Sequence, residues 1–345
     1  VFIAHGAGYK PGGETASQYA SDIITILTHS DVSPYISNNT IIGVEIGNEE
    51  DELNGTHPLW NSSGSANNPG DNKTAGENFA EYYNAARDSI RNNFPLSSYP
   101  NLLIYSFGLS KHDTLNYYDE TGFEGLGNQS EAFLHGFIDK IITSYGGSSN
   151  LPDVISIHGY DGKRPECKIY DTYYMEFKPW YSRLKRLAEI CNEHNGYTPR
   201  FSQTEYGFSP IDGKDWAVGN ANEFTQSIHY MRRALMDATM ITNAGDVWLS
   251  SLYWQHCFND NSHSNTCTGW FEDNASERQI RRVGEQFHQS GSLNIGFDGS
   301  QKLWIPLNAM PKTTGSTIYN ATCAWKKSDG IRWGAIWQFQ TSQSY

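Results

Sequence analysis

The alternation of short apolar runs with longer amphipathic stretches most strongly limits what this chain can fold into. Runs rich in β-branched and aromatic residues begin roughly 50 residues apart, as expected for strands separated by helices. They cover residues 1–5, 41–47, 101–108, 153–160, 200–207 and 247–255. Their residues are almost continuously apolar, which is typical of parallel strands buried on both faces.

Amphipathic helices are predicted between these runs. Residues 77–93, 179–194 and 220–239 each carry apolar residues at helical spacing. In the first of them the apolar face consists of Phe79, Tyr83, Ala86 and Ile90. In the second, Leu187 and Cys191 lie four residues apart on the same predicted face.

Strands and helices that alternate in this way predict an α/β fold around a parallel sheet. Long loops rich in Gly and Asn follow the strands, as they do on the active face of a (β/α)8 TIM barrel. A doubly wound open sheet is the alternative, but no glycine-rich phosphate loop follows any run. We therefore expect a TIM barrel whose first two βα units are missing before Val1.

The sequence changes character near residue 291. A last helical pattern covers residues 276–289, and residues 302–308 and 330–339 are then predicted as strands. We accordingly predict a catalytic domain over residues 1–290 and a β-rich accessory region over residues 291–345.

Charge and hydropathy restrict the partners. The formal net charge of −13 argues against nucleic acid and anionic membranes, because both select basic surfaces. The sequence contains no run of about 18 apolar residues, so no transmembrane helix is predicted. The stretch that begins at Val1 does not have the charged start of a signal peptide, so a strand in a mature or truncated chain is expected there.

Cysteines and glycosylation sequons favour a secreted protein. A disulfide between Cys257 and Cys267 would close a polar loop, and Cys167 with Cys191 is a second plausible pair, which leaves Cys323 unpaired. Asn-x-Ser/Thr sequons begin at Asn38, Asn54, Asn61, Asn72, Asn128, Asn274 and Asn320. We expect an extracellular location.

Polar side chains stand where the predicted strands end. In a parallel barrel these positions share one rim and face the substrate. They comprise Asn48 and Glu49, His158 and Tyr160, Glu205 and Tyr206, and then Trp254 and His256. Two carboxylates, a histidine and several aromatic residues are therefore expected to converge.

Two carboxylates across a pocket are what glycosidic bond cleavage requires, one protonated and one ionised. Glu49 is chosen over Glu50 and Asp51 because Asn48 precedes it, and its acidic neighbours are expected to belong to the loop. Glu45 lies mid-strand, where a buried, hydrogen-bonded structural role is expected. Glu205 ends an apolar run, where removing a carboxylate from water costs free energy, so a functional role is expected for it.

The segments "EIGNE" and "QTEYG" resemble the signature of clan A glycoside hydrolases, with patterns similar to families 39, 51, 79 and 86. These are retaining enzymes on (β/α)8 barrels. The resemblance implies that residues 41–47 and 200–207 are strands four and seven, with Glu49 as acid/base and Glu205 as nucleophile. The clan's strands one and two, with their usual Arg, have no counterpart in this chain.

The same resemblance suggests how the remaining rim residues bind substrate. It implies that Asn48 contacts the sugar 2-hydroxyl, that His158 and Tyr160 line the reacting subsite, and that Trp254 forms its floor. Tyr206 and His256 are further substrate-binding candidates at the same strand ends.

A polysaccharide or oligosaccharide substrate is expected, and no cofactor. The long loops 55–74 and 110–129 would wall a cleft, which favours endo-acting cleavage of a β-linked polysaccharide. Two alternatives stay open: a non-catalytic carbohydrate-binding protein on the same scaffold, and a metal-dependent hydrolase. The second would use His158, Asp161, His256 and His263, although no tight ligand spacing such as H-E-x-x-H supports it.

Overall fold

The chain divides into two compact units. The first comprises Val1–His158 with Arg186–Ser202, and the second comprises Gly159–Lys185 with Gln203–Tyr345. The computed structural model describes residues 2–4, 14–51, 69–109, 128–158 and 187–205, and short strands beyond them. Side chains are described for residues 14–51, 72–109, 131–158 and 187–204.

A parallel sheet follows the chain order. Its strands are β1 (Phe2–Ala4), β2 (Gly43–Ile46), β3 (Leu103–Tyr105), β4 (Val154–His158), β5 (Arg200–Glu205) and β6 (Leu249–Ser251). The pairs from β1 to β4 are parallel, with Val44 opposite Phe2 and Ile104. Each predicted run contains one of these strands, so the α/β class with a parallel sheet is confirmed.

The order of these six strands bears on the kind of α/β fold. Consecutive strands are neighbours throughout, whereas the strand order of a doubly wound sheet reverses at a switch point. Closure into a barrel lies outside the described residues and stays a prediction, as does the domain boundary at residue 290.

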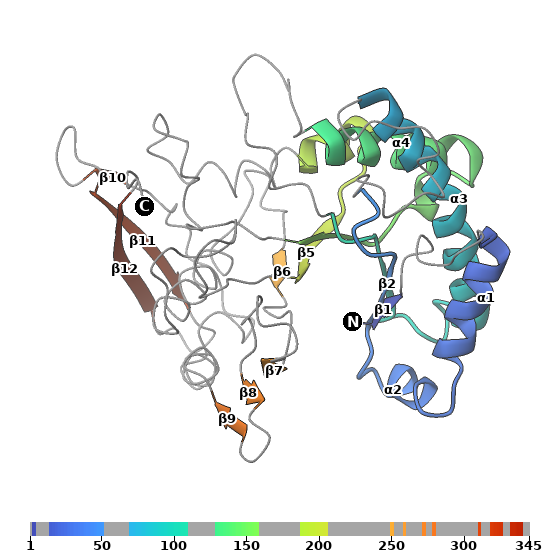
Figure 1. Ribbon diagram of the computed structural model, residues 1–345, viewed down its shortest axis with the longest axis horizontal. Helices are drawn as coiled ribbons and strands as arrows, with labels where there is room; N and C mark the ends of the chain where they lie inside the picture. The colour runs from blue at the N-terminus through green and yellow to red at the C-terminus, as the bar shows by residue number, and fades with distance from the viewer. Residues whose placement is uncertain are drawn as a thin grey trace. The chain divides into compact units, whose positions relative to one another are not determined.

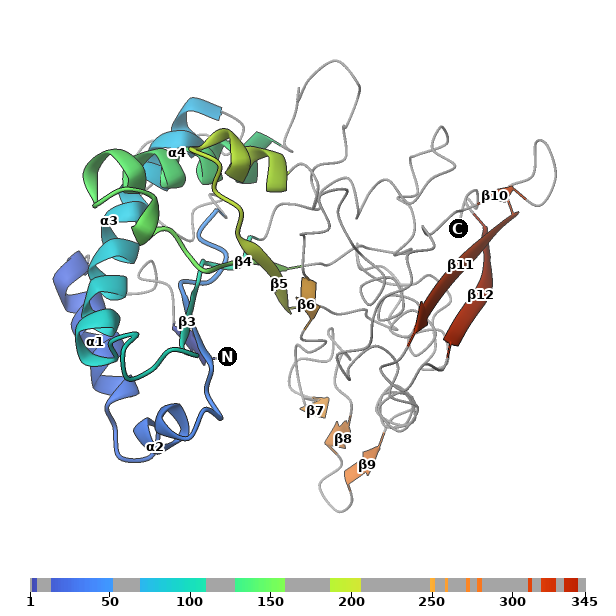
Figure 2. The ribbon, with the colours of Figure 1, turned by 180° about the vertical axis from the view of Figure 1, so that it is seen from behind.

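Helices line one side of strands β2–β4 in the first unit. They are α1 (Ala16–Leu27), α2 (Ser33–Ser37), α3 (Pro69–Asn93) and α4 (Asn128–Ser144), followed by the short 3-10 turn η3 (Ser148–Asn150). Figures 1 and 2 both show α3 lying between α1 and α4. Helix α3 begins at Pro69, where a first turn tolerates proline, so the predicted loop 55–74 is helical over its last residues.

Helix α1, which the sequence analysis did not single out, starts at a capping box. The Thr15 side chain accepts from the Gln18 backbone N–H at 3.2 Å, and the Gln18 side chain accepts from the Thr15 N–H at 3.0 Å. These bonds satisfy two amides that a helix start leaves without partners. The helix buries Tyr19, Ile23 and Leu27.

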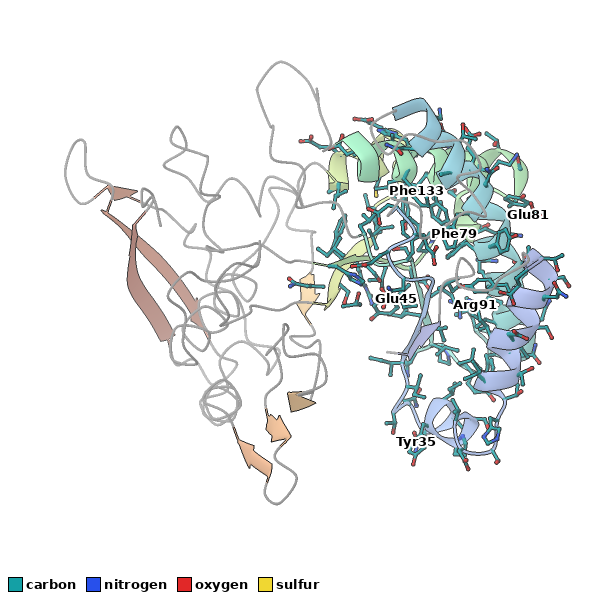
Figure 3. All side chains as sticks on the ribbon, in the orientation of Figure 1. Tyr35, Glu45, Phe79, Glu81, Arg91 and Phe133 are labelled. Carbon is teal, nitrogen blue, oxygen red and sulfur yellow. The ribbon has the colours of Figure 1, made fainter. Side chains whose placement is uncertain are left out.

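Aromatic rings fill the space between the helices and the sheet. Phe107, just after β3, packs 5.1 Å from Phe79 of α3 and 4.9 Å from Phe133 of α4, measured between ring centroids. Phe137 completes the cluster 5.2 Å from Phe107, and all four side chains are fully buried. Figure 3 shows Phe79 and Phe133 in the interior of this unit. The predicted face of α3, which includes Phe79, is confirmed as buried.

The other end of the sheet is held by Arg91 from the last turn of α3. Its guanidinium donates to the Leu102 carbonyl at 2.8 Å and to the Asp153 carboxylate at 2.8 Å. The same Asp153 oxygen accepts from the Ile104 backbone N–H at 2.7 Å. One side chain therefore joins helix α3 to the starts of β3 and β4.

Replacing Arg91 by Ala is expected to lower the free energy of unfolding by about 2 kcal/mol, because charge-assisted bonds are lost and the Leu102 carbonyl is left without its donor. Urea unfolding measures the change. Arg91→Lys keeps the charge without the two-pronged geometry and is expected to recover less than half of the loss. Equal stability of all three proteins would contradict the described role.

Two further sheets belong to the second unit. One contains β7 (Phe258–Asn259), β8 (Phe271–Asp273) and β9 (Arg278–Ile280), and the other contains β10 (Met310–Pro311), β11 (Ile318–Lys326) and β12 (Arg332–Gln340). Strand β12 matches the predicted strand at 330–339. The predicted strand at 302–308 and helix at 220–239 lie outside the described residues.

The helix predicted over residues 276–289 is wrong at Arg278–Ile280, which form strand β9. Ile280 is opposite Phe271 in an antiparallel pair with β8, and this cross-strand pairing outweighs a local helical period.

The predicted disulfide between Cys167 and Cys191 is also wrong. Cys191 is a free thiol, fully buried in the helical residues 187–193, and burial raises its pKa. Its place on the apolar face with Leu187 explains this environment, because that face packs into the core. Cys257 and Cys267 lie outside the described residues.

Candidate active site

The site is built on the turn that follows β2. Gly47 has a φ of 93° and Glu49 a φ of 54°, so the chain enters the left-handed region twice within three residues. The Glu49 backbone N–H donates to the Gly108 carbonyl at 3.0 Å, which fastens this turn to the segment after β3. A non-glycine residue in this conformation is uncommon and is held by surrounding structure.

Glu49 contacts His158, the last residue of β4. The Oε1 atom of Glu49 lies 2.8 Å from Nδ1 of His158. The His158 side chain is fully buried, whereas that of Glu49 is 26% exposed. The acid is therefore held from the protein side and remains accessible to a ligand from the solvent side.

Main-chain hydrogen bonds fix the positions of Glu49 and His158. The His158 N–H donates to the Leu109 carbonyl at 3.0 Å, and the Leu109 N–H donates to the Ser156 carbonyl at 3.1 Å. Together with the bond from Glu49 to Gly108, they extend the ladder past the ends of the strands. The ends of β2, β3 and β4 thus form one continuous backbone frame.

Gly108 makes room for the histidine ring. A Cβ atom at position 108 would overlap the His158 imidazole at Nε2 and at both neighbouring ring carbons. The ring is fully buried and contacts Glu49, so it has little room to shift, and this close approach requires glycine.

Gly108→Ala is expected to destabilise the protein by about 1–3 kcal/mol through overpacking. Because the clash is with one ring, the cost should fall by more than half in a His158→Ala background. Urea unfolding of the two single variants and the double variant gives this coupling. The same cost in both backgrounds would show that the ring is not what excludes a side chain at position 108.

The two acids after Glu49 are not solvent-facing. They lie in the turn as predicted, but Glu50 and Asp51 are both fully buried. The pKa of Glu50 is raised to about 8: burial is the largest cause, the hydrogen bond from the Asn48 N–H lowers the pKa, and the charges of Asp51 and Glu49 raise it. Glu45 is buried within β2, as predicted for a structural residue.

Three of the predicted site residues are brought together. Asn48 and Glu49 follow β2 and His158 ends β4, on either side of the segment after β3, and Asn48 is partly exposed like Glu49. Glu205 is the last residue of β5, but its side chain lies outside the described set. Tyr160, Tyr206, Trp254 and His256 also lie outside the described residues.

Two residues that shape the site, Gly108 and Glu50, are not predicted from the sequence. Gly108 follows the apolar run of β3 and carried no signal beyond its being a glycine. Glu50 stands in an acidic run that predicts a loop, and its sequence position carries no signal of burial.

Within the described part of the chain, no group of three or more His, Cys, Asp or Glu residues is arranged to hold a metal ion. Of the four residues in the metal-dependent alternative, only His158 is described, so that alternative is not tested. No helix among the described residues is long and apolar enough to cross a membrane.

Comparison with known proteins returns only distant structural similarity. No protein-family model and no curated protein matches the chain. Solved structures that resemble it include a family 39 glycoside hydrolase from Bacteroides cellulosilyticus WH2, at 12% identity and a TM-score of 0.46. A monomeric beta-xylosidase from Caulobacter crescentus CB15 has 12% identity and a TM-score of 0.43, and an endo-beta-1,4-mannanase double mutant from Cellulomonas fimi has 10% and 0.32.

The extent of these matches differs. They cover 91%, 91% and 96% of this chain, and 54%, 53% and 84% of the compared chains, respectively. The chain therefore spans about half the length of the first two proteins. At this level of similarity they assign neither a family nor a substrate to it.

Proposed function

We propose that this chain is a retaining glycoside hydrolase with Glu49 as its acid/base. One observation carries the proposal: a partly exposed carboxyl group at the end of β2 is held at 2.8 Å by a fully buried histidine at the end of β4. The ends of parallel strands are where α/β enzymes build their active sites. A carboxyl group that is fixed on one side and open on the other suits proton transfer to a ligand.

The contact with His158 is compatible with both protonation states that the reaction requires. The Nδ1–H of a neutral imidazole can donate to Oε1 of Glu49 when the carboxyl group is ionised and also when it carries its proton on Oε2. Glu49 can therefore give up a proton and regain one without losing the hydrogen bond that holds it.

In the proposed mechanism Glu205 is the nucleophile. Its carboxylate attacks the anomeric carbon while Glu49 protonates the leaving oxygen, which forms a glycosyl-enzyme and releases the aglycone. Glu49, now ionised, takes a proton from water as that water attacks the anomeric carbon and frees Glu205. Asn48 would hold the 2-hydroxyl, and His158, Tyr160, Tyr206, Trp254 and His256 would complete the substrate site.

Several finer features belong to the same proposal. The strand order supports closure into a TIM barrel, because barrel strands also pair in chain order. The catalytic domain would occupy residues 1–290 and the accessory region residues 291–345. The proposals that the enzyme cuts a β-linked polysaccharide internally and that it is secreted rest on the loops, the sequons and the sequence resemblance.

The first test is hydrolysis by the full chain of a panel containing β-xylan, β-mannan, β-glucan and aryl β-glycosides of xylose, mannose, glucose, galactose and glucuronic acid. Glu205→Gly is expected to lower kcat by more than about 10³-fold, because the nucleophile is lost. Glu49→Ala is expected to lower kcat/KM by about 10²–10⁴-fold on phenyl glycosides and much less on 2,4-dinitrophenyl glycosides, which leave without protonation. On the dinitrophenyl glycosides kcat still falls, because no base activates the water that frees Glu205. Glu81→Gln, a change of an exposed acid on α3, serves as the control.

Added azide separates the two roles. It should restore turnover of a dinitrophenyl glycoside by Glu49→Ala with a β-glycosyl azide as product, and give an α-glycosyl azide with Glu205→Gly. A wild-type protein that binds oligosaccharides without turning any of them over would instead establish the carbohydrate-binding alternative. Short oligosaccharides as early products would support internal cleavage, and release of single terminal sugars alone would exclude it.

Exhaustive chelation with EDTA followed by dialysis is expected to leave the initial rate unchanged within experimental error, because the proposed mechanism uses only carboxyl groups and water. Recovery of a lost rate by added Zn²⁺ or Mg²⁺ would favour the metal-dependent alternative.

A further inference from the structure

The turn that carries Glu49 folds around the side chain of the next residue. Oε1 of Glu50 accepts a hydrogen bond from the Asn48 backbone N–H at 3.0 Å. Glu50 is fully buried, whereas Asn48 and Glu49 are partly exposed. The Glu50 side chain thus points back beneath the two residues that face the solvent.

The Glu50 side chain packs closely against Gly47 of the same turn. A Cβ atom at Gly47 would come within 2.8 Å of Cγ and 2.9 Å of Oε1 of Glu50, and within 3.0 Å of the Phe79 ring. Gly47 also has a positive φ, so a side chain there would be strained as well as crowded. Glu50 is therefore enclosed between the turn and the aromatic core.

The charges around Glu50 come from the turn and from α1. Asp51 and Glu49 are its acidic neighbours in sequence, and Glu49 in turn contacts His158 of β4. Tyr19 of α1 is fully buried nearby. Burial is the largest cause that raises the pKa of its phenol, and the charges of Glu50 and then of Glu14 raise that pKa as well. Helix α3 contributes the apolar ring of Phe79.

We propose that Glu50 is a positioning residue, whose buried carboxyl group holds the Asn48 main chain and thereby keeps Glu49 in the left-handed conformation that brings its carboxyl group to His158. The catalytic consequence rests on the function proposed above. The positioning itself is a property of the folded chain and does not depend on any substrate.

The protonation of Glu50 supports this role. With its pKa raised from 4.5 to about 8, the group stays neutral at the pH where a carboxyl acid/base works. Between those two pH values the folded chain binds one more proton than the unfolded chain, so this group favours folding at low pH and progressively less as the pH rises toward 8. A neutral amide in its place removes that pH dependence and keeps the acceptor.

Glu50→Gln and Glu50→Met form a matched pair for the test. Both are neutral and similar in size to glutamate, but only glutamine keeps an oxygen that can accept from the Asn48 N–H. Hydrogen exchange of peptides covering residues 44–53 is measured by mass spectrometry on the full chain. Exchange should quicken by at least about tenfold in Glu50→Met and stay close to wild type in Glu50→Gln. Identical exchange in both variants would overturn the proposal.

The catalytic consequence is measured with phenyl and 2,4-dinitrophenyl glycosides of whichever sugar the wild-type enzyme accepts. A displaced acid/base should lower kcat/KM of Glu50→Met by about 10–100-fold for the phenyl glycoside and far less for the dinitrophenyl glycoside. Glu50→Gln should recover most of that loss. An equal loss on both substrates would indicate a general structural defect and contradict positioning.

Thermal unfolding from pH 4.5 to 8 completes the test without any substrate. The melting temperature of the wild type should fall relative to that of Glu50→Gln as the pH rises, and parallel curves would contradict a neutral, buried Glu50. If the wild type hydrolyses nothing in the panel, the proposed function fails. Hydrogen exchange and unfolding still decide the role of Glu50 in that case, so the two failures are distinguishable.

Discussion

The hydrogen bond between Glu49 and His158 is the interaction around which the first unit is arranged. It joins the ends of β2 and β4 across the segment that follows β3, at a distance of 2.8 Å. The ring can reach Glu49 only because position 108 has no side chain, and it stays in place because the His158 main chain is bonded to Leu109. The aromatic cluster around Phe107 supports this segment from beneath.

This arrangement places two glutamates that are adjacent in sequence in opposite environments. Glu49 lies at the surface with a histidine partner, and Glu50 lies in the interior, where burial favours its neutral form. The left-handed backbone at Glu49 produces this difference, because it turns successive side chains to different sides of the turn. Enzymes that use carboxyl groups for acid and base chemistry depend on such local contrasts.

Hydrophobic period was sufficient to predict the strands of the parallel sheet and helix α3 with its buried face, because burial of apolar residues dominates there, but it did not predict α1, α2 and α4. It failed at Arg278–Ile280, where pairing with β8 determines the structure. For Cys191 the helical period was a better guide than cysteine pairing, because the thiol is free and buried on the apolar face. Asn48, Glu49 and His158 could be predicted as a group because strand ends share an edge. Gly108 and Glu50 could not, since their roles arise from distances between segments that the sequence does not encode locally.

The frame formed by the main chain at the ends of β2, β3 and β4 has a consequence for how such proteins diverge. Reactive side chains that project from a backbone-bonded scaffold can be exchanged without dismantling the scaffold. A lineage that lost its reactive carboxyl group would retain a stable fold and the residues around the site. A single substitution could therefore turn a hydrolase of this kind into a lectin, which subsequent selection could refine for recognition alone.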